Sequence, residues 1–247
     1  GYELTDTEEK RASLLNELAK RKSFCFDTET SSLNPNTCQL LGIAFSWAAN
    51  EGHYVPLPID APLEAVSILK FFAPVLTDPK KELVGHNLKF DISVLRAKGL
   101  SVDGPFFDSM IAHALVEPDQ RHGMDYLSEV FLGYSPISIS TLIGEKGAPE
   151  GQRNLLELSK DHLDKVAQYA AEDADVTWQI AEKLRPQLKE KAQEQVFYDI
   201  ECPLMPVLAD MEKEGIAVDL DALSHIGEDL GKRSEQLRKA VFDAADG

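Results

Sequence analysis

Cysteine, long apolar runs and positive charge are all scarce in this sequence of 247 residues. Its three cysteines form no C-x-x-C pair and are odd in number, which favours ordinary buried thiols over a disulfide framework. No apolar run approaches the roughly 20 residues of a membrane-spanning helix, and the first 22 residues lack the apolar core of a signal peptide. We therefore expect a reduced, intracellular protein that does not enter a membrane.

The shortage of positive charge is the most informative of these features. There are 25 Lys and Arg residues against 42 Asp and Glu, which gives a net charge of -17. Such a chain repels polyanions at long range, which argues against a protein that coats nucleic acid by electrostatic attraction. Two interpretations of the acids remain: they form a solvated surface, or some of them hold metal ions. Their spacing distinguishes the two.

The apolar pattern predicts an α/β protein. Residues 23–27, 40–47 and 53–56 have the patterns of strands, and they follow one another without room for a helix, so we expect an antiparallel meander. Short strands are predicted at 83–85 and 105–107, and helices at 63–76 and 88–98. Together these elements predict three layers, α/β/α, with a mixed sheet, followed by C-terminal helices.

Helical patterns dominate both ends of the chain. Thr5 and Glu8 match a capping box and predict a helix that ends near residue 20. Beyond residue 108 the pattern is almost wholly helical, at 109–115, 124–131, 160–191 and 201–214, with a Gly/Pro-rich loop at 144–151. Asp219 or Asp221 is expected to cap a last amphipathic helix. That helix has few large apolar residues, so we expect it to dock on a segment of a longer protein.

Asp27 and Glu29 are the first candidate site residues. They stand two apart at the end of an apolar strand, so both side chains point to the same face. Two neighbouring carboxylates repel each other, and a buried pair needs a cation. A D-x-E pair is common on exposed strands, but here the preceding residues are Phe24, Cys25 and Phe26, which predict burial and favour a functional pair.

Asn87 and Asp91 form the second candidate group. They lie four apart on one face of a helix that follows a buried strand and a glycine. Strand ends that lead into helices are where α/β folds place ligand groups. Plain helix capping, with Asn87 at the N-cap and Asp91 in the first turn, is an equal alternative.

Tyr169 and Asp173 form the third group, four apart on one helix face. Glu172 lies on the flank of that face, and Asp175 is rotated well away from it. A tyrosine hydroxyl beside a metal-bound carboxylate can orient a water or help to take its proton. The alternative is a solvated acidic helix face with a half-buried tyrosine.

Four acids and a tyrosine in this order, on strand, helix and helix, match one known pattern. The sequence resembles the DEDDy exonucleases of the RNase H-like superfamily, and more closely the 3'→5' exonuclease domain of bacterial family A DNA polymerases, of the DNA polymerase I type. The resemblance covers nearly the whole chain. It is carried by FDTETSSL at 26–33, VGHNLKFD at 84–91, FDSMIAHAL at 107–115, RHGMDYL at 121–127, YAAEDADVT at 169–177 and ECPLMPVLADMEKEGIAVD at 201–219.

The resemblance implies two-metal catalysis by five residues. Asp27, Glu29 and Asp173 would hold the ion that activates water, with Asp27 also bridging toward a second ion and Asp91 near that second ion. Tyr169 would position the attacking water. Oxygen-only ligands indicate Mg²⁺ or Mn²⁺ for both divalent ions.

The resemblance also implies substrate contacts. Leu33 lies where family members use a leucine as a wedge against the terminal bases, and Asn87 is a candidate for a sugar–phosphate contact. Arg121 is another such candidate, with a loop salt bridge as an equal alternative. His86 and Phe90 stand where familiar members carry Gln and Tyr, which leaves the hydrogen bonds of those two residues open. The full set of substrate-binding candidates is Thr28, Leu33, His86, Asn87, Phe90 and Arg121.

The implied function is that of a proofreading module of a DNA polymerase I. It would cut 3'-terminal phosphodiester bonds of DNA and release nucleoside 5'-monophosphates, as a monomer in the bacterial cytoplasm. Its partners would be a single-stranded DNA 3' end and the remainder of the polymerase chain. Residues 1–195 would form the exonuclease domain, and residues 196–247 the truncated helical start of the polymerase domain, without a polymerase site.

Two alternative functions are kept open. One is an RNA 3'-end exonuclease of the RNase D type, against which the block at 201–219 argues; the other is a catalytically silent structural module. The net charge predicts weak intrinsic DNA affinity. A basic island at Lys80, Lys81, Lys89, Arg96 and Lys98 is the one local exception, and it is interpreted either as a DNA contact or as a solvated helix face.

Overall fold

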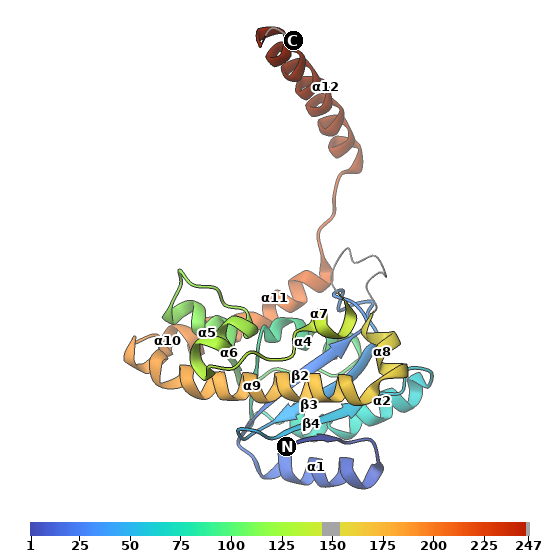
Figure 1. Ribbon diagram of the computed structural model, residues 1–247, viewed down its shortest axis with the longest axis vertical. Helices are drawn as coiled ribbons and strands as arrows, with labels where there is room; N and C mark the ends of the chain where they lie inside the picture. Colours follow the sequence, from blue (N-terminus) through green and yellow to red (C-terminus); the bar gives the residue numbers. More distant parts are fainter. Residues whose placement is uncertain (145–153, 246–247) are drawn as a thin grey trace. The chain divides into compact units, whose positions relative to one another are not determined.

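A mixed sheet forms the middle layer of residues 1–213 in the structure, which is a computed structural model that describes residues 1–144 and 154–245 (Figure 1). Most of the predicted loop at 144–151 therefore lies outside the described residues. Within them the sheet has six strands in the order β1-β4-β3-β2-β5-β6. The strands are β1 (Tyr2–Leu4), β2 (Ser23–Thr30), β3 (Leu40–Ser46), β4 (Gly52–Pro56), β5 (Glu82–Gly85) and β6 (Phe106–Asp108).

The predicted antiparallel meander is confirmed. β3 pairs antiparallel with both β2 and β4, while β5 pairs parallel with β2 and with β6, so the sheet is mixed. β1 was not predicted from the sequence. It pairs parallel with β4, with Tyr2 opposite Gly52. A strand of three residues is too short to show a two-residue period.

The helices lie in the predicted ranges, except that two of the predicted helices are each divided into two shorter ones. The predicted helix at 63–76 is divided at Phe72, beside Pro74, which lies in the first turn of the following helix, where its missing N–H is tolerated. The predicted helix at 160–191 is divided at His162. The helices are α1 (Glu8–Lys20), α2 (Pro62–Phe71), α3 (Ala73–Leu76), α4 (Leu88–Ala97), α5 (Ser109–Val116), α6 (Met124–Leu132), α7 (Ile139–Ile143), α8 (Leu155–Asp161), α9 (Leu163–Glu190), α10 (Glu194–Val196), a π-helical turn (Phe197–Glu201), α11 (Cys202–Glu214) and α12 (Leu220–Ala244).

One predicted cap is wrong and another is confirmed. The N-cap of α1 is Thr7, whose hydroxyl accepts from the N–H of Lys10 at 3.3 Å. Thr5 is buried instead, and its N–H donates to the carbonyl of Tyr54, so it continues the pairing of β1 with β4. Asp219 caps α12 by accepting from the N–H of Ala222 at 2.9 Å, as one of the two predicted alternatives requires.

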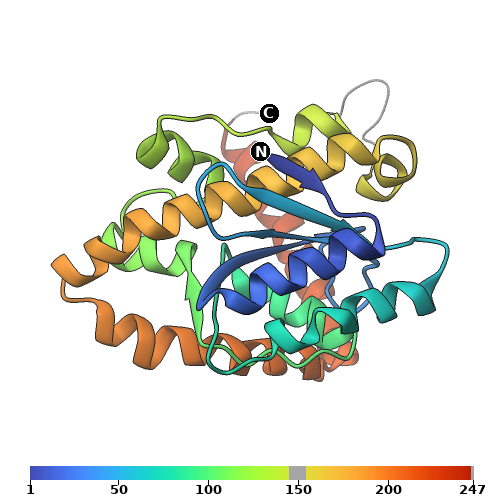
Figure 2. The ribbon, with the colours of Figure 1, turned by 90° about the horizontal axis from the view of Figure 1, so that it is seen from below.

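Helices cover both faces of the sheet (Figure 2). α9 packs along one face, against β1 to β5. Its close approach depends on Gly52, because a Cβ there would meet the carbonyl oxygen of Ala171 at 2.4 Å. On the other face the ring of Phe45 stacks on Phe72, between α2 and α3, at 5.3 Å. The predicted three-layer architecture is thus confirmed, and α9 is placed across the strands that carry the candidate acids.

The chain divides into two units, Gly1–Lys213 and Glu214–Gly247. In the first, α11 contributes Cys202, Met205 and Ala209 to the buried core. In the second, α12 has an amphipathic pattern, with Leu223, Ile226, Leu230 and Leu237 on one face. No helix among the described residues is both long and apolar enough to span a bilayer.

Candidate active site

β2 and α9 bring three carboxylates together. Ligand oxygens of Asp27, Glu29 and Asp173 all lie within 4.8 Å of one another. The two residues of β2 share a face because they are two apart, and that face is the one covered by α9, which supplies Asp173. Glu29 and Asp173 are buried, so the group is not a solvated acidic surface.

The fourth acid, Asp91, is joined to the same strand by Thr28. The backbone N–H and the hydroxyl of Thr28 both donate to Oδ1 of Asp91, at 3.0 and 2.5 Å. Asp91 lies in the first turn of α4 and is only 3% exposed. β2 therefore carries two of the four acids and fixes a third through the residue between them.

Burial raises the pKa of all four carboxyl groups. Desolvation raises the pKa of Asp27 to about 6. Desolvation, followed by the negative charges of the neighbouring acids, holds the pKa of Glu29, Asp91 and Asp173 well above its ordinary value. Four such carboxylates are stable as a group when cations compensate them.

The donor set fits a hard divalent cation. Oδ1 of Asp173 is buried and has no hydrogen-bond partner among the described residues, which leaves a ligand position open. All candidate ligands are carboxylate oxygens, which Mg²⁺ and Mn²⁺ prefer. Asp27, Glu29 and Asp173 can hold one such ion, and Thr28 of the same strand holds the carboxylate of Asp91.

Tyr169 lies one turn before Asp173 on α9 and is half-buried. Burial, and then the charges of Asp173 and Glu29, raise the pKa of its hydroxyl, which is therefore protonated at neutral pH. A neutral phenol next to the acids is able to donate a hydrogen bond to a water or to a phosphate oxygen.

The other two acids of the same segment have structural roles. Glu172 accepts from the hydroxyl of Tyr134 and the N–H of Ile137, both at 2.6 Å. Asp175 accepts from the hydroxyl of Tyr2 and the N–H of Asn50, both at 2.9 Å. The predicted rotation of Asp175 away from the site is confirmed, and its partners fix β1 and the turn between β3 and β4 on α9.

The substrate-binding candidates at the start of α4 have different environments. Asn87 is exposed in a left-handed conformation, with φ of 60°, and its side chain makes no capping hydrogen bond among the described residues. Phe90 is half-buried beside Asp91. Nδ1 of His86 lies 2.8 Å from the hydroxyl oxygen of Ser109, and burial lowers the pKa of His86 to about 4, so this imidazole is neutral.

The remaining substrate-binding candidates lie on segments outside the helices. Leu33 follows β2 and is 91% exposed, as a wedge residue requires. Arg121 places its guanidinium over the ring of Tyr126, 4.6 Å from the centroid. Thr28 is buried, and its donors are used for Asp91.

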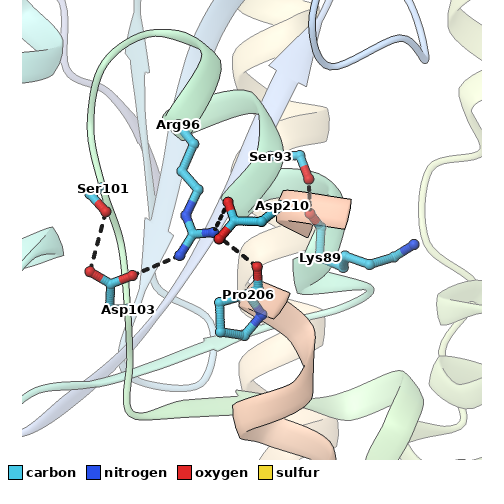
Figure 3. Close-up of polar contacts among 7 residues, drawn as sticks. All are labelled: Lys89, Ser93, Arg96, Ser101, Asp103, Pro206 and Asp210. Carbon is cyan, nitrogen blue, oxygen red and sulfur yellow. Dashed lines mark hydrogen bonds and ion pairs between the residues drawn. The ribbon is translucent and has the colours of Figure 1, made fainter. Parts of the chain in front are cut away.

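Four of the five residues of the predicted basic island make polar contacts within the protein. Arg96 donates to Asp103 and Asp210, both at 2.7 Å, and to the carbonyl of Pro206 at 2.9 Å (Figure 3). Lys89 pairs with Glu212. Lys98 donates to the carbonyl of Cys38, and Lys81 is buried against the carbonyls of Leu18, Ala19 and Arg21 at the end of α1. The charges of these four residues are therefore engaged by groups of the protein itself.

Asp108 is a structural residue that no motif in the sequence indicates as part of the site. Its Oδ1 accepts from the N–H groups of Asn87, Met110 and Ile111, and its Oδ2 from the N–H of Leu88. An aspartate directly before a helical pattern is an N-cap signal, and this signal predicts the contact of Asp108 with the first turn of α5. Its contact with α4, some 20 residues earlier, has no local signal.

Comparisons with known proteins agree with this arrangement. Residues 2–189 match a family model described as 3'-5' exonuclease. The chain is 33% identical over 240 residues to DNA polymerase I of Pseudomonas aeruginosa, a match that covers 94% of this chain and 26% of that protein. The chain thus spans about a quarter of the length of this relative.

Two solved structures show the same fold at low sequence identity. One is the POL domain of Pol1 from M. smegmatis in complex with DNA primer-template and dNTP, with a TM-score of 0.71 and 19% identity over 97% of this chain and 37% of that one. The other is Brucella melitensis NrnC with bound Mg²⁺, with a TM-score of 0.61 and 18% identity over 86% of this chain and 92% of that one. The chain belongs to the 3'-5' exonuclease family, as a domain with an RNase H-like nuclease fold that is related to the exonuclease domains of bacterial DNA polymerase I.

Proposed function

We propose that this chain is a metal-dependent 3'→5' exodeoxyribonuclease. The observation that carries the proposal is the group of carboxylate oxygens from half-buried Asp27 and buried Glu29 and Asp173, with Asp91 tied to the same strand. The family match and the open ligand position on Asp173 support it.

The proposed reaction is hydrolysis of the 3'-terminal phosphodiester bond. Bound divalent ions would lower the pKa of water and compensate the charge that develops on the phosphate. The four acids would hold these ions, and the hydroxyl of Tyr169 would orient the attacking water. Water adds to phosphorus, the bond to the O3' of the penultimate nucleotide breaks, and that oxygen takes up a proton. The products are a nucleoside 5'-monophosphate and a shortened strand.

The proposed substrate is a single-stranded DNA 3' end. Leu33 is exposed beyond β2 and would act as a wedge against the terminal bases, and Asn87 and Arg121 would contact sugar and phosphate. The net charge of -17 and the engaged basic island favour weak binding of DNA by this chain alone. Tight binding of DNA would then depend on the rest of a longer polymerase chain.

The proposed biological role is proofreading within a polymerase chain. Residues 1–195 would be the exonuclease domain and residues 196–247 the start of the polymerase domain, consistent with relatives four times as long as the match. The face of α12 that carries Leu223, Ile226 and Leu230 would then pack on the polymerase domain. A bacterial polymerase of this kind acts in the cytoplasm, where its DNA is.

An RNA exonuclease is the second candidate. The catalytic core of RRP6 from Trypanosoma brucei has a TM-score of 0.63 to this chain at 16% identity, which is a likeness of fold. Matched DNA and RNA oligonucleotides distinguish the candidates, because they differ at the 2'-hydroxyl group. Faster release from DNA supports the proposal, and faster release from RNA contradicts it.

A silent structural module is the third candidate, and titration with Mn²⁺ tests it. The proposal requires calorimetric binding of Mn²⁺ by the parental chain and loss of that binding in Asp173→Asn. Absence of binding in the parental chain, together with absence of nucleotide release, would establish the silent module.

A further inference from the structure

We propose that Asp108 is a positioning residue for the metal site: it fixes the start of α4, and thereby Asp91, relative to the other acids. This inference rests on the proposed function, because it assumes that Asp91 takes part in metal binding. Asp108 itself does not touch the four acids. It acts through the backbone of α4.

The Asp108 carboxylate is saturated with backbone donors from two helices. It is 1% exposed, and it accepts from the N–H of Leu88 at 2.7 Å and of Met110 at 2.8 Å, with Asn87 and Ile111 each at 3.2 Å. Asn87 and Leu88 begin α4, and Met110 and Ile111 lie in the first turn of α5. All four partners are donors, so the ionised carboxylate is the form that fits.

The sheet explains how one side chain reaches two helices. β5 and β6 are parallel neighbours, and Gly85 is paired with Asp108 at their ends. α4 therefore starts beside the position at which α5 starts. The chain turns from β5 into α4 through Asn87 in a left-handed conformation, which Asn adopts more readily than most non-glycine residues.

A second contact fixes the start of α5 to β5. The hydroxyl of Ser109 donates to the carbonyl of Gly85 at 3.1 Å, so Nδ1 of His86 must donate to Ser109. α5 in turn packs on α9, the helix that carries Asp173. Asp108 thus joins the helix that carries Asp91 to a helix that is fixed on the one that carries Asp173.

Asp91 is consequently held from two sides. Thr28 holds its carboxylate from β2, and Asp108 holds the N–H of Leu88, three residues earlier in the same helical turn. If the bond to Leu88 is lost, the start of α4 is free to move while Thr28 still holds the side chain. The arrangement of the metal ligands then changes. Loss of a group that orients a metal ligand typically lowers metal affinity by about 10- to 100-fold.

Two substitutions remove the contact with α4 and preserve that with α5. In Asp108→Asn the amide oxygen can replace Oδ1, but the amide NH₂ then faces the N–H of Leu88, donor against donor. In Asp108→Ser the hydroxyl remains a good N-cap for α5 and is too short to reach Leu88. Lys81→Met is the matched control, because it removes another buried, charged helix cap at the opposite end of β5.

The first readout is the dissociation constant for Mn²⁺, measured by calorimetry on the folded proteins. We expect Asp108→Asn and Asp108→Ser to bind Mn²⁺ about 10- to 100-fold more weakly than the parental protein, and Lys81→Met to bind it equally well. Parental affinity in both Asp108 variants overturns the inference alone. Absence of Mn²⁺ binding in the parental protein overturns the proposed function and this inference together.

The second readout needs no variant, so it also applies if the substitutions prevent folding. It is amide hydrogen exchange at 86–91 in the parental protein, with and without Mg²⁺. If opening of this segment destroys the metal site, a free Mg²⁺ concentration ten times the dissociation constant slows exchange there about tenfold. Exchange at 86–91 that Mg²⁺ leaves unchanged overturns the inference.

Discussion

Thr28 and Asp91 are joined by two hydrogen bonds to a single carboxylate oxygen, one from the backbone N–H and one from the hydroxyl of Thr28. The two residues are 63 positions apart, and Thr28 lies between the acids Asp27 and Glu29. The strand that presents two of the acids therefore also sets the orientation of a third. This contact ties three of the four acids to one strand.

Removal of the Thr28 hydroxyl tests that contact. We predict that Thr28→Val, which keeps the shape and the backbone bond, lowers kcat for DNA hydrolysis by about 10- to 100-fold. Thr28→Ser retains the hydroxyl and should remain within a few-fold of the parental rate. Nucleotide release from a single-stranded oligonucleotide measures both. A parental rate in Thr28→Val would contradict the role of the hydroxyl.

Asp173→Asn should nearly abolish activity. The substitution removes a negative ligand from the group formed with Asp27 and Glu29, and leaves an amide in its place. We predict a loss of at least about 100-fold in kcat and a loss of Mn²⁺ binding. Asp164→Asn, an exposed carboxylate on the same helix, makes the same change in net charge and should leave both quantities unchanged.

Tyr169→Phe should separate binding of metal from catalysis. The side chain keeps its half-buried ring and loses only the hydroxyl that is proposed to orient water. We expect kcat to fall about 100-fold, while the dissociation constant for Mn²⁺ stays at the parental value. A variant with the parental kcat would contradict the role of the hydroxyl.

His86→Gln should change the pH dependence of stability. The pKa of His86 is about 4 in the folded protein because of burial, against 6.5 ordinarily. The unfolded chain therefore binds a proton first as pH falls, so the stability due to the neutral imidazole is complete above pH 6.5 and is lost toward pH 4. The loss is at most about 3 kcal/mol.

Urea unfolding at pH 7.5 and pH 4.5 measures this effect. The difference in unfolding free energy between the two pH values should be smaller in His86→Gln than in the parental protein. His225→Gln, at an exposed position on α12, controls for the removal of one histidine. An identical pH dependence in the parental protein and His86→Gln would refute the assignment of a buried, neutral imidazole.

Local periodicity was sufficient for much of the site. The two-residue period of a strand places Asp27 and Glu29 on one face, and the spacing of four places Tyr169 and Asp173 on one face of a helix. Both relationships depend only on neighbouring residues. The same holds for the cap of α12 by Asp219, which needs nothing beyond its own first turn.

The features that could not be predicted depend on distant partners. Thr5 failed as a cap because it pairs with Tyr54, and nothing near Thr5 signals the pairing of β1 with β4. The guanidinium of Arg96 forms an ion pair with Asp210, which lies more than 100 residues later in the chain. Asp108 reaches back to α4 through the register of two parallel strands, which periodicity alone does not fix.

Release of nucleoside 5'-monophosphate from a 3'-labelled, single-stranded DNA oligonucleotide tests the central claim most directly. The parental chain and Asp91→Ala are compared in Mg²⁺, and the parental chain is then treated with EDTA. We predict release by the parental chain in Mg²⁺ alone, and none with EDTA or with Asp91→Ala. Release at the parental rate by Asp91→Ala, or in EDTA, would contradict a metal-dependent nuclease site built from these four acids.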